Sequence, residues 1–299
     1  MSNNNIVKGV FLVGLGATSY GMLATFVKLA YQEGFTTAEV TSSQFIYGII
    51  GILLINIFQK QQAKTSVIKA SKRNIFQLML AGTSLGMTSV FYYLCVKYLN
   101  VSIAIILLMQ SVWIGVLLEW FLDKKAPSKQ KIFAVIIVLI GTLLATNLLN
   151  SSVEIDWIGM LFGMLAACSF TTTMFTANKI ALGVSTAQRS LYMLLGGVVI
   201  IAGFALFTQT TPFNMEIFMK WGIVLALFGT IIPPMLMNSG FPRIGLGLGS
   251  IVSSLELPVS VMMAFFILNE TVILSQWLGV LLIIFAIVIM NINFSKIRK

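Results

Sequence analysis

The chain has 299 residues, of which 58% are hydrophobic and only 9% are charged, and its mean hydropathy is +0.97. A soluble domain carries roughly 25% charged residues, so a single water-exposed globular core is excluded. The formal net charge is +10, but the basic residues gather in short loops between apolar runs, which fits a membrane protein better than a nucleic-acid-binding groove.

Long apolar stretches recur ten times along the chain. A helix needs about 20 residues to cross the roughly 30 Å of hydrocarbon in a bilayer. We therefore predict an all-α polytopic membrane protein with ten transmembrane helices, and we expect no cleavable signal peptide because the first stretch is long enough to span. The predicted spans are 8–30, 38–58, 74–97, 101–121, 131–149, 157–179, 187–207, 218–239, 246–268 and 275–294.

The loops between the predicted spans divide the basic residues unequally between the two sides of the membrane. If the N-terminus is cytoplasmic, 16 of the 19 basic residues lie inside, and Lys28, Lys97 and Lys220 remain outside. Cytoplasmic loops carry an excess of Lys and Arg. The bias therefore predicts a multi-pass protein of the plasma (inner) membrane with both termini in the cytoplasm.

The second half of the chain repeats the first. The segment Thr36-Thr37-Ala38-Glu39 at the start of span two matches Ser185-Thr186-Ala187-Gln188 at the start of span seven, and both predict helix-capping boxes. Gly82-Thr83 in span three matches Gly229-Thr230 in span eight at a similar offset. Because five spans reverse the direction of the chain, we predict two inverted five-helix repeats at 1–150 and 151–299, an arrangement typical of secondary transporters.

One segment carries a family resemblance. Residues 253–259 read Ser-Ser-Leu-Glu-Leu-Pro-Val, and span nine closes with Leu268-Asn269-Glu270. These motifs and the repeat resemble the EamA-type transporters of the drug/metabolite transporter superfamily over nearly the whole chain. Asn269 stands where the family usually has glycine, and Gln44 stands where its second helix often carries arginine, so any role of that arginine does not transfer. The resemblance implies a carrier of small metabolites, amino acids or drugs without naming the substrate.

Glu256 lies near the middle of span nine, where a carboxylate costs about 2.5–3.5 kcal/mol on insertion scales. Such an acid either faces a polar cavity or is protonated, so we predict that Glu256 binds substrate or couples transport to protons. Ser253 and Ser260 share its helical face. Pro258 removes a backbone donor and predicts a local kink. The alternative is a neutral carboxyl that packs by hydrogen bonding to a neighbouring helix.

Gln110 in span four is the repeat-mate of Glu256, so a central site contacted by both halves is expected. Trp113 would offer that site an aromatic wall, with ordinary helix packing as the alternative. Weaker candidates for the same cavity are polar residues within other spans, namely Gln44, Tyr92, Ser19, Ser169 and Thr172. Predicted weak points, at which a helix bends or moves, are Pro233, Pro234 and Pro258 in the second half and Gly86 in the first.

We predict a secondary transporter that moves small organic metabolites, amino acids or drug-like solutes across the cytoplasmic membrane by alternating access, with export the favoured direction. An uptake carrier, a uniporter or a channel-like facilitator of the same superfamily is the main alternative. A lipid-modifying membrane enzyme is a remote one, because the sequence offers no nucleophile with a base. No cofactor, metal ion or nucleic acid is expected. The expected partners are a small-molecule substrate, the lipid bilayer and protons, and a homodimer is left open.

Overall fold

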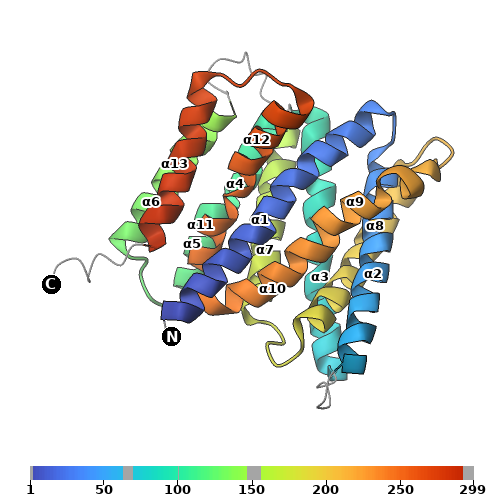
Figure 1. Ribbon diagram of the computed structural model, residues 1–299, viewed down its shortest axis with the longest axis horizontal. Helices are drawn as coiled ribbons and strands as arrows, with labels where there is room; N and C mark the ends of the chain where they lie inside the picture. The colour runs from blue at the N-terminus through green and yellow to red at the C-terminus, as the bar shows by residue number, and fades with distance from the viewer. Residues whose placement is uncertain (1–2, 63–69, 100, 147–155, 292–299) are drawn as a thin grey trace.

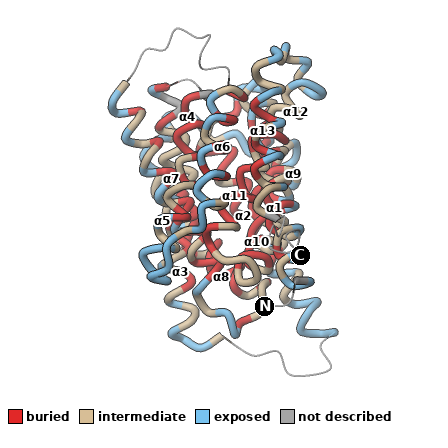
Figure 2. The backbone as a smooth tube through the Cα atoms, turned by 90° about the vertical axis from the view of Figure 1, so that its left-hand side faces the viewer, coloured by how far each residue is buried: buried red, intermediate tan, exposed pale blue. Residues whose placement is uncertain are grey.

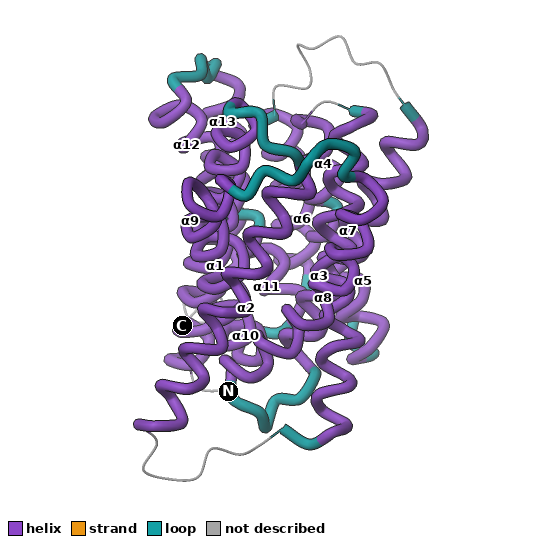
Figure 3. The backbone as a smooth tube through the Cα atoms, turned by 90° about the vertical axis from the view of Figure 1, so that its right-hand side faces the viewer, coloured by secondary structure: helices purple, strands orange, loops and turns teal. Residues whose placement is uncertain are grey.

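A computed structural model describes residues 3–62, 70–99, 101–146 and 156–291. These residues form an elongated bundle of helices without a strand, and the longer loops lie at its two ends (Figures 1 and 3). The predicted boundary between the halves at 150 and 151 and the ends of spans five and ten lie outside the described residues. So do several basic residues that the orientation count used: Lys64, Lys69, Lys296, Arg298 and Lys299.

The first half of the chain forms six helices where five spans were predicted, because span four is interrupted. Their bounds are α1 Asn3–Gln32, α2 Thr37–Gln62, α3 Lys72–Tyr98, α4 Val101–Met109, α5 Ser111–Asp123 and α6 Lys129–Ala145. The N-terminus of α1 and the end of α2 lie at the same end of the bundle (Figure 1).

The second half has two composite spans. Its first helices are α7 Trp157–Lys179 and α8 Thr186–Thr208. Span eight combines the π-helical turns η2 Phe218–Gly222 and η3 Leu227–Ile231 with the α-helices α9 Ile223–Ala226 and α10 Ile232–Ile244. Span nine divides into α11 Leu246–Ser253 and α12 Glu256–Leu268, and α13 Leu274–Asn291 follows.

The described residues contain eight helical stretches that are long and apolar enough to cross a membrane. A shorter apolar helix, Leu274–Met290, accompanies them. These stretches confirm the all-helical, multi-pass character of the chain. The predicted count of ten is not established by length and composition, because α6 has 17 residues and lies at the short end of the spanning range.

Helices of one half pack mainly against helices of the other half. α3 lies against α7 and α8, α1 against α10 and α12, α5 against α11, and α6 against α13. The α6–α13 pair forms one side of the bundle (Figure 1). Exchanging the halves converts the α3–α7 contact into the α1–α10 contact, and it converts the α3–α8 contact into the contact of α2 with α9 and η3. The packing therefore has the pattern that an internal repeat produces.

Buried residues lie mainly inside the bundle and exposed residues mainly on its outside and at its ends (Figure 2). Most of the buried residues are small or apolar, and many large apolar residues are exposed. A central cluster unites residues of α1, α4, α6, α7, α10, α11, α12 and α13, including Val13, Met109 and Phe241. Phe11, Ile136 and Phe285 are among the large apolar residues that stay exposed. An apolar outer surface is what a protein surrounded by lipid requires.

The two predicted capping boxes form to different extents. At the start of α2, the Thr36 hydroxyl accepts a hydrogen bond from the Glu39 amide at 3.2 Å, and the Thr36 amide donates to Glu39 Oε2 at 2.7 Å. At the start of α8, the Ser185 hydroxyl accepts from the Gln188 amide at 3.3 Å. The side-chain oxygen of Gln188 is buried without a hydrogen-bond partner among the described residues, so the return bond is not made there.

Close approach of α3 to α8 depends on glycine. A Cβ atom on Gly196 would lie 1.9 Å from the backbone oxygen of Met79, whereas nothing lies within 4 Å of a Cβ on Gly203 in the same helix. Gly196→Ala is therefore expected to destabilise the protein by about 1–3 kcal/mol through overpacking. Gly203→Ala should be neutral or stabilising by about 0.5–1 kcal/mol, because alanine favours the helix. Melting temperatures in detergent test this difference, and equal values for the two variants would contradict it.

Candidate functional site

The two predicted repeat-mates, Gln110 and Glu256, both lie where a span is interrupted. Gln110 separates α4 from α5, and its amide donates to the Leu107 carbonyl at 3.1 Å. Glu256 begins α12 directly after the break that ends α11. Breaks in paired helices of two inverted halves are the usual place for a transporter's binding site.

Pro258 explains the break in span nine. Proline has no amide hydrogen, so the Ser254 carbonyl cannot receive the usual bond from four residues later. It accepts instead from the Leu257 amide at 3.2 Å, and the Leu255 amide donates to the Val252 carbonyl at 3.1 Å. These tighter turns interrupt the helix at the level of Glu256.

The two interrupted spans touch one another across the halves. The Ser250 hydroxyl of α11 donates to the Val112 carbonyl of α5 at 3.2 Å. A Cβ atom on Gly115 would lie 2.7 Å from that hydroxyl oxygen, so the glycine permits the contact. The contact lies within about one turn of each break, so small residues hold the two interrupted spans together there.

Glu256 is half-buried, and its Oε2 atom is fully covered without a hydrogen-bond partner among the described residues. α1 approaches it closely, since a Cβ atom on Gly21 would lie 2.5 Å from the backbone oxygen of Glu256. The carboxylate interacts electrostatically with the phenol groups of Tyr20 on α1 and Tyr92 on α3. Its surroundings thus include two tyrosines and a tightly packed helix.

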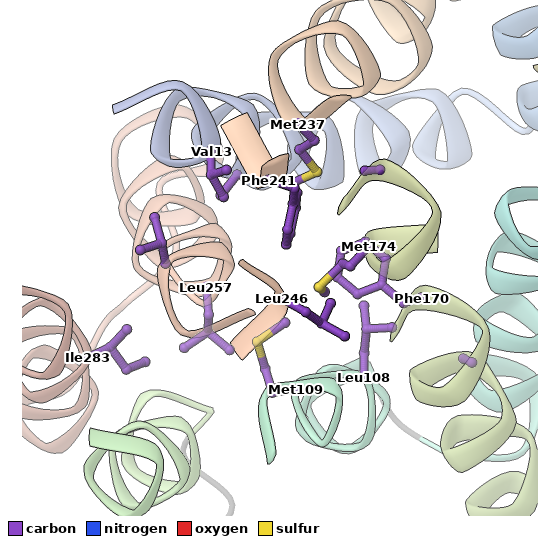
Figure 4. Close-up of a cluster of buried hydrophobic side chains, with 14 of the residues drawn as sticks. Val13, Leu108, Met109, Phe170, Met174, Met237, Phe241, Leu246, Leu257 and Ile283 are labelled. Carbon is purple, nitrogen blue, oxygen red and sulfur yellow. The ribbon is translucent and has the colours of Figure 1, made fainter. Parts of the chain in front are cut away.

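The central cluster lies directly beside Glu256. Leu257 belongs to the cluster, and Leu255, Tyr20 and Tyr92 pack against it. Phe170 meets the Tyr20 ring edge to face, with the ring centroids 6.2 Å apart. Figure 4 shows the thioether side chains of three methionines around the same centre, contributed by different helices: Met109, Met174 and Met237. The carboxylate therefore borders an aromatic and sulfur-rich interior.

Glu39 shows how a structural carboxylate is treated in the same protein. It is 2% exposed, and its Oε1 atom accepts from the Asn214 amide at 2.7 Å and from the Gln209 side chain at 3.1 Å. Its Oε2 atom accepts from the Thr36 amide. Glu39 is thus fully satisfied, which distinguishes it from Glu256.

Gln110 and Trp113 are paired with each other. The Trp113 ring nitrogen donates to Gln110 Oε1 at 2.8 Å, and Gln110 Nε2 donates to the Ile106 carbonyl at 3.0 Å. Both residues are half-buried. This arrangement ties Trp113 to the break in span four, and it leaves the Gln110 side chain occupied by the protein.

The serine and glutamine candidates lie at helix contacts. Ser253 is buried and donates to the Gly249 carbonyl at 2.9 Å, and Ser19 donates to the Phe228 carbonyl at 3.1 Å. Gln44 packs against Gly229. Ser260 and Ser169 are half-buried. None of these contacts brings the side chain to the Glu256 carboxylate.

Thr172 corrects one expectation. It is exposed, and its hydroxyl bonds the Cys168 carbonyl of its own helix at 2.9 Å. Leu161, Leu165 and Cys168 are exposed on the same face of α7. Residues at this spacing share one side of a helix, so Thr172 faces outward with them and does not enter the central site.

The predicted weak points at the prolines and at Gly86 have different outcomes. Pro233 and Pro234 begin α10 directly after the π-helical turn η3, so an irregular helix does occur there. α3 instead runs unbroken through Gly86, where a Cβ atom would lie 2.5 Å from the Gly197 carbonyl oxygen. A close helix contact accounts for Gly86, which is a correction to its expected role as a hinge.

Two structural features were missed from the sequence. Tyr20 was not among the candidates, although a phenol in the middle of span one was a sign of a polar interior. Arg189 was counted only as a cytoplasmic charge, yet it is 2% exposed and donates to four backbone carbonyls, namely Ile180, Asn238, Thr176 and Ala177. The signal for Arg189 was its position in the first turn of an apolar span.

One hollow lies away from the carboxylate. It is an open groove of about 480 Å³ on α13. Its lining is entirely apolar: Leu278, Leu281, Leu282, Ile284, Phe285 and Val288. Most of these side chains are exposed on the outside of the bundle, so the groove faces outward.

The fold and the composition define a multi-pass helical membrane protein, and the interrupted helices are of the kind that transporters use. The EamA-like transporter family matches at residues 7–147 and 157–292, so the chain belongs to this family of membrane transporters of small solutes. A solved structure described only as the crystal structure of a protein has a TM-score of 0.76 at 13% identity, covering 93% of this chain and 97% of that one. At this identity the likeness concerns the fold alone. No curated protein matches the chain.

Proposed function

We propose that this protein is a secondary transporter that moves a small organic solute across the cytoplasmic membrane by alternating access, with export as its direction. The observation that carries the proposal is the covered Oε2 atom of Glu256 at the break between α11 and α12, which has no hydrogen-bond partner in the part of the chain that the structure describes. Burying an acid within the membrane costs free energy, so a role in function is the default hypothesis for such a residue. A solute or a proton that reaches Oε2 would supply the missing partner.

The proposed topology has ten spans in two inverted halves, 1–150 and 151–299, with both termini in the cytoplasm. In this topology α6 and α13 are the fifth and tenth spans. They pack closely together, since a Cβ atom on Gly279 would lie 2.4 Å from the Gly141 carbonyl oxygen. The contacts that interchange with the halves support the repeat. Basic residues at the ends of the described helices gather where α1 begins, since Lys72 and Arg73 start α3, Lys129 starts α6, and Lys124 and Lys125 follow α5.

Glu256 is the proposed coupling residue if protons drive the cycle. The titratable groups that interact with it electrostatically are the phenols of Tyr20 on α1 and Tyr92 on α3. A protonated Glu256 would donate to a neighbour, and a charged one would bind a solute, so one residue can alternate between the two partners. The break beside it allows the ends of span nine to move separately.

Ion pairs between the halves lie at both ends of the bundle and can act as gates. Lys28 pairs with Glu270, and Lys220 lies 3.7 Å from Glu33, near the ends of α1 and α12. Lys179 pairs with Asp123 at 3.0 Å at the opposite end. All of these pairs are exposed, and such pairs are worth about 0–1 kcal/mol each. They can therefore close an end without locking it.

Counterflow in proteoliposomes tests the proposal. Purified protein is reconstituted, the vesicles are loaded in turn with an amino acid or an organic amine, and uptake of the same labelled compound from outside is measured. A carrier shows trans-stimulation, because the loaded site returns faster than the empty one, and a channel-like facilitator does not. Trans-stimulation by at least one compound of the panel is expected. Its absence for the whole panel, or flux that is independent of loading, would reject the carrier.

A further inference from the structure

Glu256 differs in depth from every other charged residue of the described helices. Glu39 and Arg189 lie in the first turn of α2 and α8, and Glu119 lies in the last turn and a half of α5. Lys28 lies four residues before the end of α1. The chain has no histidine. The middle of the described bundle therefore carries one acidic group and no basic group to balance it.

Arg189 is the basic residue most deeply enclosed, and it is already committed. Its guanidinium group donates to the carbonyls of Ile180 and Asn238, at 3.1 and 2.8 Å, and to those of Thr176 and Ala177. These contacts hold the end of α7 against the middle of α10, so the guanidinium group is not free to bind a solute. A carboxylate on a solute at Glu256 would thus find no positive partner, and burying an unpaired charge is costly.

The surroundings of Glu256 favour positive charge in a second way. Tyr20 and Tyr92 lie within electrostatic range of the carboxylate, and Phe170 stacks edge to face on Tyr20. Aromatic faces attract cations, most strongly when water is excluded. The methionine sulfurs of the central cluster are polarisable and adapt to apolar bodies of different shape. The lining thus suits an apolar or aromatic body attached to a cationic group.

We propose that the central site takes small organic monocations, primary amines with an apolar or aromatic body, and discriminates against zwitterions and anions of the same shape. The ammonium group donates to Glu256 Oε2, and the body packs between Tyr20, Tyr92 and the methionine cluster. The discrimination arises because a solute carboxylate would meet the Glu256 carboxylate with no basic residue of the described bundle to offset it. Glu256 therefore repels anions as well as attracting cations. This inference rests on the proposed transport function and narrows its substrate class.

Three probes with the same ring and different charge test the inference. 2-Phenylethylamine is a cation, phenylalanine a zwitterion and 3-phenylpropionate an anion at neutral pH. Binding to the purified full chain in detergent is followed by the rise of the melting temperature with ligand concentration, since a ligand that prefers the folded state stabilises it. We expect the amine to bind about tenfold or more tightly than phenylalanine, and the anion not to bind.

The matched variants are Glu256→Gln and Glu216→Gln, which remove a carboxylate from the site and from an exposed ion pair. Glu256→Gln should abolish the preference for the amine, and Glu216→Gln should keep it. Equal or tighter binding of phenylalanine, no stabilisation by the amine, or an unchanged preference in Glu256→Gln would overturn the inference. Counterflow with phenylalanine but not with the amine would reject the cation site and leave the carrier function supported. Binding of the amine without counterflow of any compound would reject the carrier function alone.

Discussion

Replacing Arg189 with leucine is expected to lower the free energy of unfolding by about 3–5 kcal/mol, among the largest effects of any single substitution. The side chain is 2% exposed and donates to carbonyls of two helices and the turn between α7 and α8. Hydrogen bonds from a charged donor are worth about 1.5–3 kcal/mol each, and buried carbonyls left without a donor add their desolvation cost. Leucine replaces the volume and none of these bonds.

Pro242 explains why one of the carbonyls bound by Arg189 requires a donor from another helix. Proline at position 242 has no amide hydrogen, so the Asn238 carbonyl lacks its usual partner within α10. Arg189 supplies that partner at 2.8 Å. In a double-mutant cycle, Pro242→Ala should therefore stabilise the Arg189→Leu variant more than it stabilises the parent protein. Equal effects in both backgrounds would show that the two residues are not coupled.

Melting temperature in detergent and yield of monodisperse protein measure the effect of Arg189→Leu. Arg243→Leu is the control, because Arg243 lies at the same end of the bundle and donates to the Ser239 carbonyl of its own helix. Arg189→Lys keeps the charge but not the planar fork of donors, so its stability should fall between the two. A melting temperature of Arg189→Leu as high as that of Arg243→Leu would contradict the prediction.

The positions of the long helices could be predicted because lipid imposes a length on every apolar stretch. The break at Glu256 followed from one covalent fact, the missing amide hydrogen of Pro258. The break at Gln110 has no proline or glycine beside it, and it was not predicted. Local chemistry therefore accounts for one break, and the other had no local signal in the sequence.

Side-chain orientation was the part that the sequence could not supply. α7 is apolar on its lipid face and on its packing face, so its periodicity does not say which face holds Thr172. Small polar residues present the same ambiguity, since Ser253 satisfies its hydroxyl within its own helix. The partners of Arg189 come from α10 and from the end of α7, and their proximity depends on how the helices pack. These features belong to tertiary structure, which hydropathy does not encode.

Glu256→Gln is expected to reduce solute flux at least tenfold while the protein remains folded. Glutamine keeps the size of the side chain, but it neither carries the negative charge nor exchanges a proton. Because Oε2 of Glu256 has no hydrogen-bond partner among the described residues, the substitution removes no bond at that atom. Burying an amide is cheaper than burying a charge, so the melting temperature of the variant should be unchanged or higher.

Glu39→Gln provides the contrast that makes this prediction specific. Glu39 accepts from two backbone amides and from the Gln209 side chain. A glutamine there turns one acceptor into a donor that faces other donors, so the free energy of unfolding should fall by about 1–3 kcal/mol. Measured in the same liposomes below its melting temperature, Glu39→Gln should keep flux and its pH dependence. Full flux in Glu256→Gln with an unchanged pH profile, or equal loss of flux in both variants, would remove Glu256 from the mechanism, because the buried charge would then serve packing and not transport.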